Sequence, residues 1–141
     1  MSRYVRWIAP LFLIGGAAAP AFADDLAGQK AILCTAVQAT DCHPDTGCET
    51  TAPWNLNIPQ FIEIDLAGKM LSTTKASGEN RSTPIRSLLR EDGNIYLQGV
   101  EGGRAFSFVI TEATGMASMA VAREDVTVSV FGVCTPLPAG K

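Results

Sequence analysis

Short runs of alternating apolar and polar residues follow one another along most of the chain. In residues 60–66, Ile62, Ile64 and Leu66 fall on one side, and residues 105–111 repeat the pattern. A period of two is typical of a β-strand with one buried face. We therefore predict about eight strands, at residues 31–37, 60–66, 70–74, 85–89, 95–98, 105–111, 116–122 and 126–133.

Turn-forming residues separate these strands and leave no room for helices between them. The separators are Ala67-Gly68, Asp92-Gly93-Asn94, Gly102-Gly103, Thr114-Gly115 and Glu124-Asp125. Connections this short join neighbouring strands in antiparallel order. The sequence therefore predicts an all-β fold, a small antiparallel meander that forms a barrel or a sandwich.

For two of the predicted strands the sequence allows a more specific structural prediction. Residues 82–89 match a capped helix with Pro84 at its first position, but we favour a strand because Asp92-Gly93-Asn94 suits a hairpin with the residues that follow. The last strand is apolar on both faces, with Phe131 and Val133 on the second face, which predicts that other elements cover its end.

The aromatic residues divide between the strands and one irregular segment. Phe61, Phe106 and Phe108 occupy strand positions and are predicted to lie in the core. Residues 39–59 follow no strand or helix period and are predicted to form a long irregular excursion. Trp54 in this segment either plugs one end of the barrel or offers a stacking surface to a ligand, and we favour the plug.

The amino terminus has the features of a signal peptide. Two arginines precede an apolar run that ends in a small-residue cleavage motif: Arg3, Arg6, residues 7–19 and Ala21-Phe22-Ala23. The run contains Pro10, Gly15 and Gly16 and is shorter than the roughly 18 residues of a membrane-spanning helix, so a retained anchor is the less favoured alternative. We predict a signal peptide over residues 1–23, a single domain over residues 24–141, and a periplasmic or secreted protein with no membrane anchor after cleavage.

Cleavage makes the remaining chain more acidic. The full chain has 11 lysines and arginines against 14 acidic residues. Loss of Arg3 and Arg6 leaves 9 against 14, a formal charge of −5. This charge excludes nucleic acid as an expected partner and permits a basic protein.

All four cysteines lie after the predicted cleavage site, and an even number in a small exported domain predicts two disulfides. Three pairings are possible. We favour Cys42 with Cys48, because the intervening turn-forming residues bring the two cysteines together. Cys34 then pairs with Cys134, which joins the first strand to the last and favours a barrel over a sandwich.

The sequence predicts no catalytic residue, no metal site and no cofactor. His43 is the only histidine, and a zinc site with Cys42 and Cys48 would compete with their disulfide. Glu63 and Asp65 share one face of a strand, as paired hydrolase carboxylates would, but a solvent-facing strand explains them better. The chain also lacks a nucleophile elbow, a phosphate-binding loop and a dinucleotide fingerprint.

A few side chains remain as candidate contacts for a ligand or a partner. Arg86 with Arg90, or Gln98 with Arg104, would line a polar pocket or hold an anion, and Trp54 would stack on a ligand if it is not a plug.

The carboxy-terminal half resembles known exported proteins. Residues 97–107 and 114–135 are similar to small secreted proteins of proteobacteria whose function is not characterised. Ser77-Gly78 resembles, more weakly, the Ser-Gly loop of periplasmic inhibitors of c-type lysozyme, which are small disulfide-bonded β-barrels. That resemblance implies Ser77 and Gly78 as contacts to a basic target. The prediction is a non-catalytic binding module for a small ligand or a protein, with an inhibitor of this kind or a carboxylate-dependent hydrolase as alternatives.

Overall fold

A computed structural model describes residues 25–137 of the chain. The predicted signal peptide therefore lies outside the described residues. The described residues form ten β-strands and two short 3-10 helices, and no α-helix. The strands are β1 Ala31–His43, β2 Gly47–Thr51, β3 Phe61–Asp65, β4 Met70–Thr73, β5 Ser82–Pro84, β6 Ser87–Glu91, β7 Asn94–Glu101, β8 Arg104–Thr111, β9 Met116–Arg123 and β10 Val126–Pro136, and the helices are η1 Pro53–Leu56 and η2 Lys75–Ser77.

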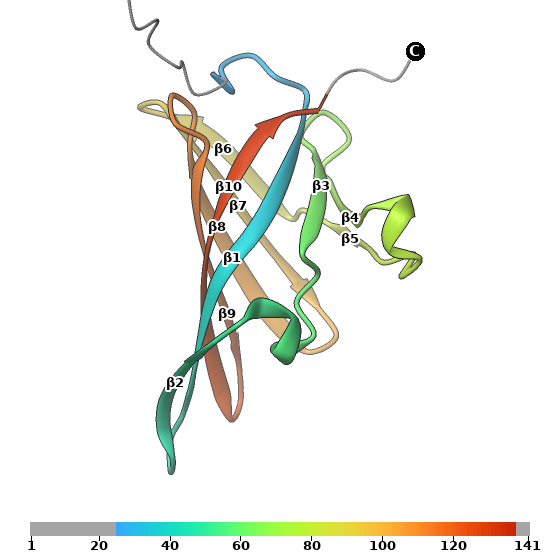
Figure 1. Cartoon of the computed structure of the whole chain (residues 1–141). Helices are drawn as coiled ribbons and strands as arrows, with labels where there is room; N and C mark the ends of the chain where they lie inside the picture. The colour runs from blue at the N-terminus through green and yellow to red at the C-terminus, as the bar shows by residue number, and fades with distance from the viewer. Residues whose placement is uncertain (1–24, 138–141) are drawn as a thin grey trace, which may run out of the picture.

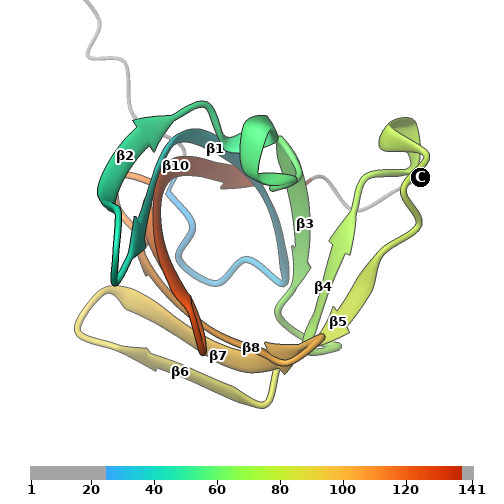
Figure 2. The ribbon, with the colours of Figure 1, turned by 90° about the horizontal axis from the view of Figure 1, so that it is seen from below.

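The strands form one antiparallel sheet that curls into a half-barrel (Figures 1 and 2). Their order is β5-β4-β3-β1-β10-β9-β8-β7-β6, and β2 pairs separately with β1. The curl brings the chain after β5 back against β7, where the Arg86 N–H donates to the Gln98 carbonyl at 2.8 Å. The all-β antiparallel prediction is confirmed, with the barrel only half closed.

The first and last strands pair at the centre of the sheet. Cys34 lies directly opposite Cys134, and their disulfide joins β1 to β10 across 100 residues of sequence. The second disulfide joins Cys42 to Cys48 across the β1–β2 hairpin. Both predicted pairings are confirmed, and no cysteine is free.

The hairpin turns follow from glycine and its neighbours. Asp92-Gly93 and Gly102-Gly103 all have positive φ, as a tight two-residue hairpin turn requires. The first turn joins β6 to β7, which confirms the strand favoured for this segment. The helix alternative is wrong, and the segment consists of two strands, β5 and β6, with a bend between them at Ile85–Arg86.

Residues 39–59 are more regular than the sequence predicted. β1 runs on to His43 and β2 occupies Gly47–Thr51, so the irregular part is confined to η1 and the residues around it. The prediction failed because this hairpin is held by pairing rather than by an apolar face: its strands carry Thr, Asp and Glu, and β1 also pairs with β10. Thr40 and Thr50 hydroxyls lie 2.9 Å apart across it.

The core lies inside the curl. It is built from the inward side chains of all the long strands, and Ile32, Ile64, Ile95, Leu97 and Ile110 are fully buried. Phe106 and Phe108 belong to it, as predicted. Phe61 does not: it is 42% exposed, because it pairs with outward-facing Thr35 while Ile62 faces inward.

The two ends of the half-barrel differ. Residues 25–30 cross one end, seen as the blue segment at the far side of the ring in Figure 2, and Leu26 is fully buried there. The Leu26 N–H donates to the Glu112 carbonyl at 2.9 Å, which fixes this plug in place. The predicted Trp54 plug is wrong: Trp54 is 60% exposed on η1, near the other end. A short segment before the first strand supplies the plug instead.

The prediction that other elements cover the end of β10 is also wrong. Phe131 and Val133 face outward and are 55% and 47% exposed, since no second layer packs on the outer side of the sheet within the described residues. No helix in this part of the chain is long and apolar enough to cross a membrane.

Candidate functional site

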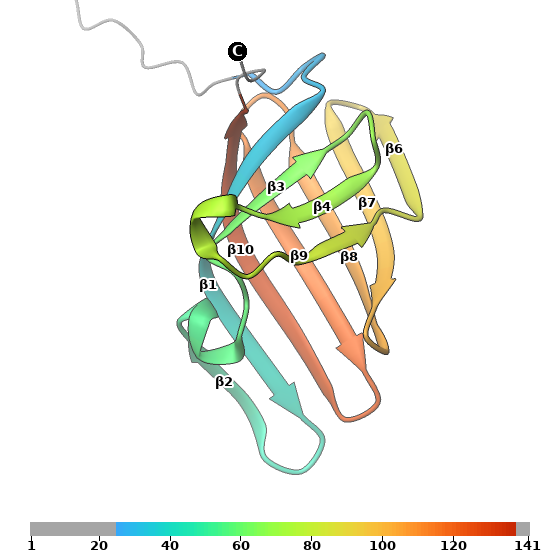
Figure 3. The ribbon, with the colours of Figure 1, turned by 90° about the vertical axis from the view of Figure 1, so that its right-hand side faces the viewer.

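The end of the half-barrel opposite Leu26 holds a cavity of about 110 Å³. Three loops form its rim: the residues after η1, the residues after η2, and the β7–β8 turn. Figure 3 shows η1, η2 and the strands β3, β4 and β5 on this side of the molecule. The walls come from both halves of the sheet, and the lining residues include Ile58, Ile62, Leu71, Thr83, Phe106, Phe108, Met119 and Val121.

Most of the inner wall of the cavity is apolar. The rings of Phe106 and Phe108 meet edge to face with centroids 5.9 Å apart. Gly99, opposite Phe106 in the register, leaves the space that the Phe106 ring fills, because a Cβ at Gly99 would overlap that ring. Among the described residues Thr83 is a polar residue that is buried, at 6% exposed, and it also lines the cavity. A ligand group entering here meets mostly hydrocarbon, with Ser72, Thr73 and Thr83 as the hydroxyl-bearing residues of the lining.

Arg81 ties the loops of the rim together. Its Nη2 donates to Glu101 Oε2 at 3.3 Å, and its Nη1 donates to the Asn57 carbonyl at 3.4 Å. The same Nη1 lies 3.7 Å from Glu79 Oε2. These contacts reach the η1 loop, the η2 loop and the β7–β8 turn, so Arg81 acts as a positioning residue for the rim.

Arg104 is the less engaged cation at the rim. Its Nη2 lies 3.9 Å from Glu101 Oε2, a carboxylate oxygen that Arg81 already binds more closely. Within residues 25–137 the Arg104 side chain makes no hydrogen bond. Its side chain is 40% exposed and lines the cavity. The guanidinium therefore presents free N–H donors beside an apolar wall, an arrangement suited to an anionic group.

The size of the cavity limits what it accepts. Typical small-molecule sites have volumes of roughly 300–1,000 Å³, whereas an engineered cavity of about 150 Å³ takes benzene. The present cavity, about 110 Å³, has room for one side chain or a short hydrocarbon tail. No protein-family model, no curated protein and no solved structure matches this chain. The chemistry of the site has to come from its own residues.

The structure separates the arginines and glutamine that the sequence grouped. Arg104 lines the cavity, while Arg86 and Gln98 line a second, shallow hollow of about 480 Å³ on the outer face. Arg90 lies at the plugged end, where its Nη1 is 3.3 Å from Glu112 Oε1 and its Nη2 donates to the Gln29 carbonyl at 2.6 Å. The predicted pair of Gln98 with Arg104 is not formed.

The remaining predicted contacts lie near the rim without lining the cavity. Trp54 is on η1, and its carbonyl accepts the Asn57 N–H at 3.2 Å, so it sits beside the cavity wall. The Ser77 hydroxyl donates to the Thr74 carbonyl at 2.7 Å and accepts the Glu79 N–H at 3.3 Å. Gly78 ends η2 with φ of 70°. The polar groups of Ser77 thus stabilise their own loop.

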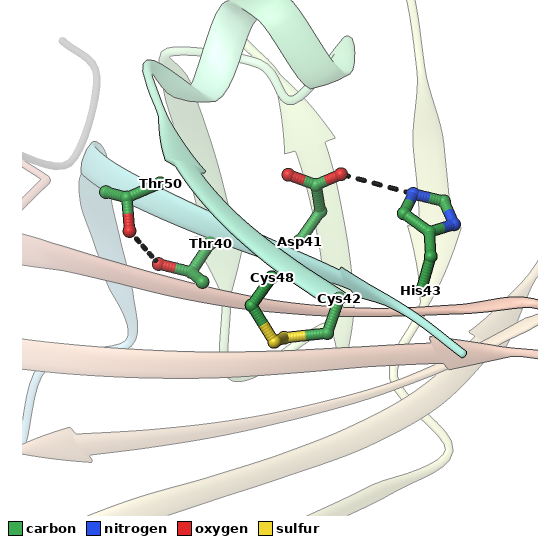
Figure 4. The surroundings of a disulfide bond; sticks show 6 residues. All are labelled: Thr40, Asp41, Cys42, His43, Cys48 and Thr50. Atoms are coloured by element: carbon green, nitrogen blue, oxygen red, sulfur yellow. Dashed lines mark hydrogen bonds and ion pairs between the residues drawn. A yellow bond between two sulfur atoms is a disulfide. The ribbon is translucent and has the colours of Figure 1, made fainter. Parts of the chain in front are cut away.

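His43 belongs to the β1–β2 hairpin (Figure 4). Its Nε2 lies 3.2 Å from Asp41 Oδ2, on the side of the hairpin opposite the Cys42–Cys48 bond. Both sulfurs are bonded to each other and so are not zinc ligands. Among the described residues no group of three histidine, cysteine or acidic side chains is placed to hold a metal ion.

Two other carboxylates have local structural roles. Asp65 Oδ1 accepts the Gly68 N–H at 2.7 Å in the β3–β4 turn. Asp65 therefore stabilises its own turn, a role that Glu63 does not share. At the tip of the β9–β10 hairpin Arg123 donates to Asp125 at 2.9 Å, and this hydrogen bond lowers the pKa of the Asp125 carboxyl. Neither acid faces the cavity.

Sequence reasoning missed Arg81 and Glu101. Arg81 lies in the loop before β5 and Glu101 is the last residue of β7, and they meet because the curl of the sheet brings this loop to the end of β7. Glu101 does precede a Gly-Gly turn that the sequence marks, and Arg104 follows it. A charged residue on each side of a tight turn is the one local signal of this rim.

Proposed function

We propose that this protein is a non-catalytic binding module of the periplasm or the secreted fraction, and that the open end of its half-barrel is the binding site. The two disulfides indicate an oxidising compartment, which agrees with the predicted signal peptide. The observation that carries the proposal is the apolar cavity with Arg104 on its rim, whose guanidinium makes no hydrogen bond within the described residues and a single long ion pair, 3.9 Å to Glu101.

The ligand that fits this site has an apolar group and a carboxylate. The apolar group fills the space beside Phe106, Phe108 and Met119 and is thereby removed from contact with water. The carboxylate lies on Arg104, which can donate two parallel hydrogen bonds to it. Glu101 stays paired with Arg81, whose rim contacts remain in place.

Two sources supply such a group. One is a short-chain carboxylic acid, and the other is the carboxyl terminus of a peptide or protein that ends in an apolar residue. The chemistry at the cavity is the same for both. A net negative protein surface favours neither source, but it selects against nucleic acid.

Arg104→Gln is expected to weaken hexanoate binding by about 10-fold to 100-fold, because a hydrogen bond to a charged group contributes about 1.5–3 kcal/mol. Isothermal titration calorimetry measures the affinity, with hexanol as a neutral ligand whose binding should not change. The tripeptide Gly-Gly-Leu, with a free or an amidated carboxyl terminus, separates the peptide source from the small acid.

Arg86→Gln is the matched control, since Arg86 lies on the outer face and outside the cavity. It should leave both affinities unchanged. The proposal fails if neither carboxylate binds, or if the two arginine variants bind hexanoate as the parent does.

A further inference from the structure

The outer face of the sheet carries large apolar side chains that nothing covers within residues 25–137. Met116 is 65% exposed, Val37 62%, Phe131 55%, Val133 47%, Phe61 42% and Val109 38%. We call these six residues the outer apolar patch. A monomer rarely exposes so many large apolar side chains on one face without a partner.

The strand register brings the patch residues together. One row runs directly across four strands as Phe61, Thr35, Val133 and Met116. A second row places Phe131 opposite Ser118, which is opposite Val109. The two rows are neighbours on β10, because Phe131 and Val133 are two residues apart on one side of the strand.

A β-bulge in β1 adds Val37 to the patch. The pairing with β10 shifts between Ala36 and Gln38, so that Val37 has no partner there. Ala36 lies opposite inward-facing Gly132, and Ala39 is fully buried, which leaves both intervening residues on the outer side. Gly132 permits this bulge, since a Cβ on it would overlap the Thr35 carbonyl oxygen. The backbone is thus arranged to expose one additional valine beside Phe131.

The face around the patch has no charged side chain on β8, β9 or β10, while Glu63 and Asp65 share the outer side of β3 with Phe61. The outward positions of β8, β9 and β10 are occupied only by Ala105, Ser107, Val109, Thr111, Met116, Ser118, Ala120, Ala122, Thr127, Ser129, Phe131, Val133 and Thr135. A partner that covered this face with charged residues would bury them without counter-ions, at a large cost in free energy. The partner surface must therefore be uncharged and apolar as well.

From this electrostatic match we propose that the partner is a second copy of this chain, placed by a two-fold axis so that the outer apolar patch covers itself. A two-fold contact needs one self-complementary surface, and an uncharged apolar face meets that condition. Two copies that each carry a net negative charge still approach here, because the outward positions of β1, β9 and β10 carry no charge and the nearest acids, Glu63 and Asp65, lie toward the edge of the face on β3.

The area of the face indicates a reversible dimer. Strands spaced about 4.8 Å apart, rising about 3.3 Å per residue, give roughly 500 Å² for four strands over eight residues. Stable interfaces bury about 800 Å² per partner. A contact of this size belongs to the weak, transient class of interfaces, so the dimer should dissociate on dilution.

Sedimentation velocity of the protein without its signal peptide, from about 5 µM to 1 mM, tests this proposal. The dimer fraction should rise with concentration. It should also rise with added sodium chloride, because salt screens the repulsion between two negative copies and leaves an apolar contact intact. Phe131→Glu and Met116→Glu should each weaken the dimer about 100-fold, because the two-fold axis places two new carboxylates in the contact.

Val100→Glu is the matched control: Val100 is 58% exposed on β7, outside the patch, and its replacement should leave the dimer unchanged. Circular dichroism melts establish that each variant is folded. A protein that stays monomeric at 1 mM overturns the proposal, and that result would indicate that the patch binds a different partner. So does a dimer that both patch variants preserve, or one that Val100→Glu dissociates.

Discussion

Removing the Cys34–Cys134 disulfide is expected to destabilise the protein far more than removing the Cys42–Cys48 disulfide. The first bond closes a loop with a sequence separation of 100, and the second closes one with a separation of 6. By the chain-entropy relation the two loops contribute about 4.7 and about 2 kcal/mol. Cys34 and Cys134 are also buried in the core, whereas Cys48 is exposed on the hairpin.

The comparison uses paired variants, because a single substitution would leave a free thiol that exchanges with the other bond. Cys34→Ala with Cys134→Ala should melt roughly 10–20 °C below Cys42→Ala with Cys48→Ala, given the usual relation between free energy and melting temperature in a domain of this size. Cys134→Ser and Cys48→Ser should follow the same order. Equal melting temperatures for the two pairs, or the reverse order, would contradict the role given to the central bond.

Gly115→Ala is expected to cost about 2–5 kcal/mol of unfolding free energy, the sum of about 1–2 kcal/mol for its backbone conformation and about 1–3 kcal/mol for steric overlap. Gly115 has φ of 67°, which L-residues adopt at a cost of about 1–2 kcal/mol. A Cβ there would in addition overlap the carbonyl oxygen of Cys134. The Gly115 carbonyl accepts the Cys134 N–H at 2.7 Å, so the overlap separates the β8–β9 turn from β10 at the disulfide.

Gly103→Ala measures the backbone-conformation part of this cost alone, so that the difference between the two variants gives the steric part. Gly103 has φ of 77° in another hairpin turn, and a Cβ on it would meet nothing within 4 Å. It should lose only about 1–2 kcal/mol. Urea denaturation of the two variants measures the difference. If both lost the same amount, the close approach of Gly115 to Cys134 would not exist in the protein.

Local patterns in the sequence were enough to predict most of the strands and turns, but not β2 or the division of residues 82–91 into β5 and β6. The alternation at Ile62 and Ile64 located β3, and Asp92-Gly93 located the β6–β7 hairpin, because both signals depend on neighbouring residues only. The disulfide pairing followed from the short spacing of Cys42 and Cys48. Each of these features is decided within a few residues of sequence.

The parts that failed depend on contacts between distant segments. Leu26 precedes the first strand and has no periodic neighbours, so nothing in the sequence marks it as the plug that Trp54 was predicted to be. Phe61 and Phe131 resemble core residues because strand patterns do not say which apolar face is covered. The rim of the cavity was not predicted for the same reason: Arg81 and Glu101 are 20 residues apart in the sequence and belong to different halves of the sheet.

The most direct test of the open-end binding site is a two-dimensional NMR titration of the protein with hexanoate, following backbone amides and methyl groups. Binding at the cavity predicts that the perturbed signals centre on Thr83, Arg104, Phe108 and Met119, while Arg86, Ser87 and Gln98 of the outer hollow remain unchanged. Perturbations centred on the outer hollow, or none at millimolar hexanoate, would contradict the assignment of this cavity as the binding site.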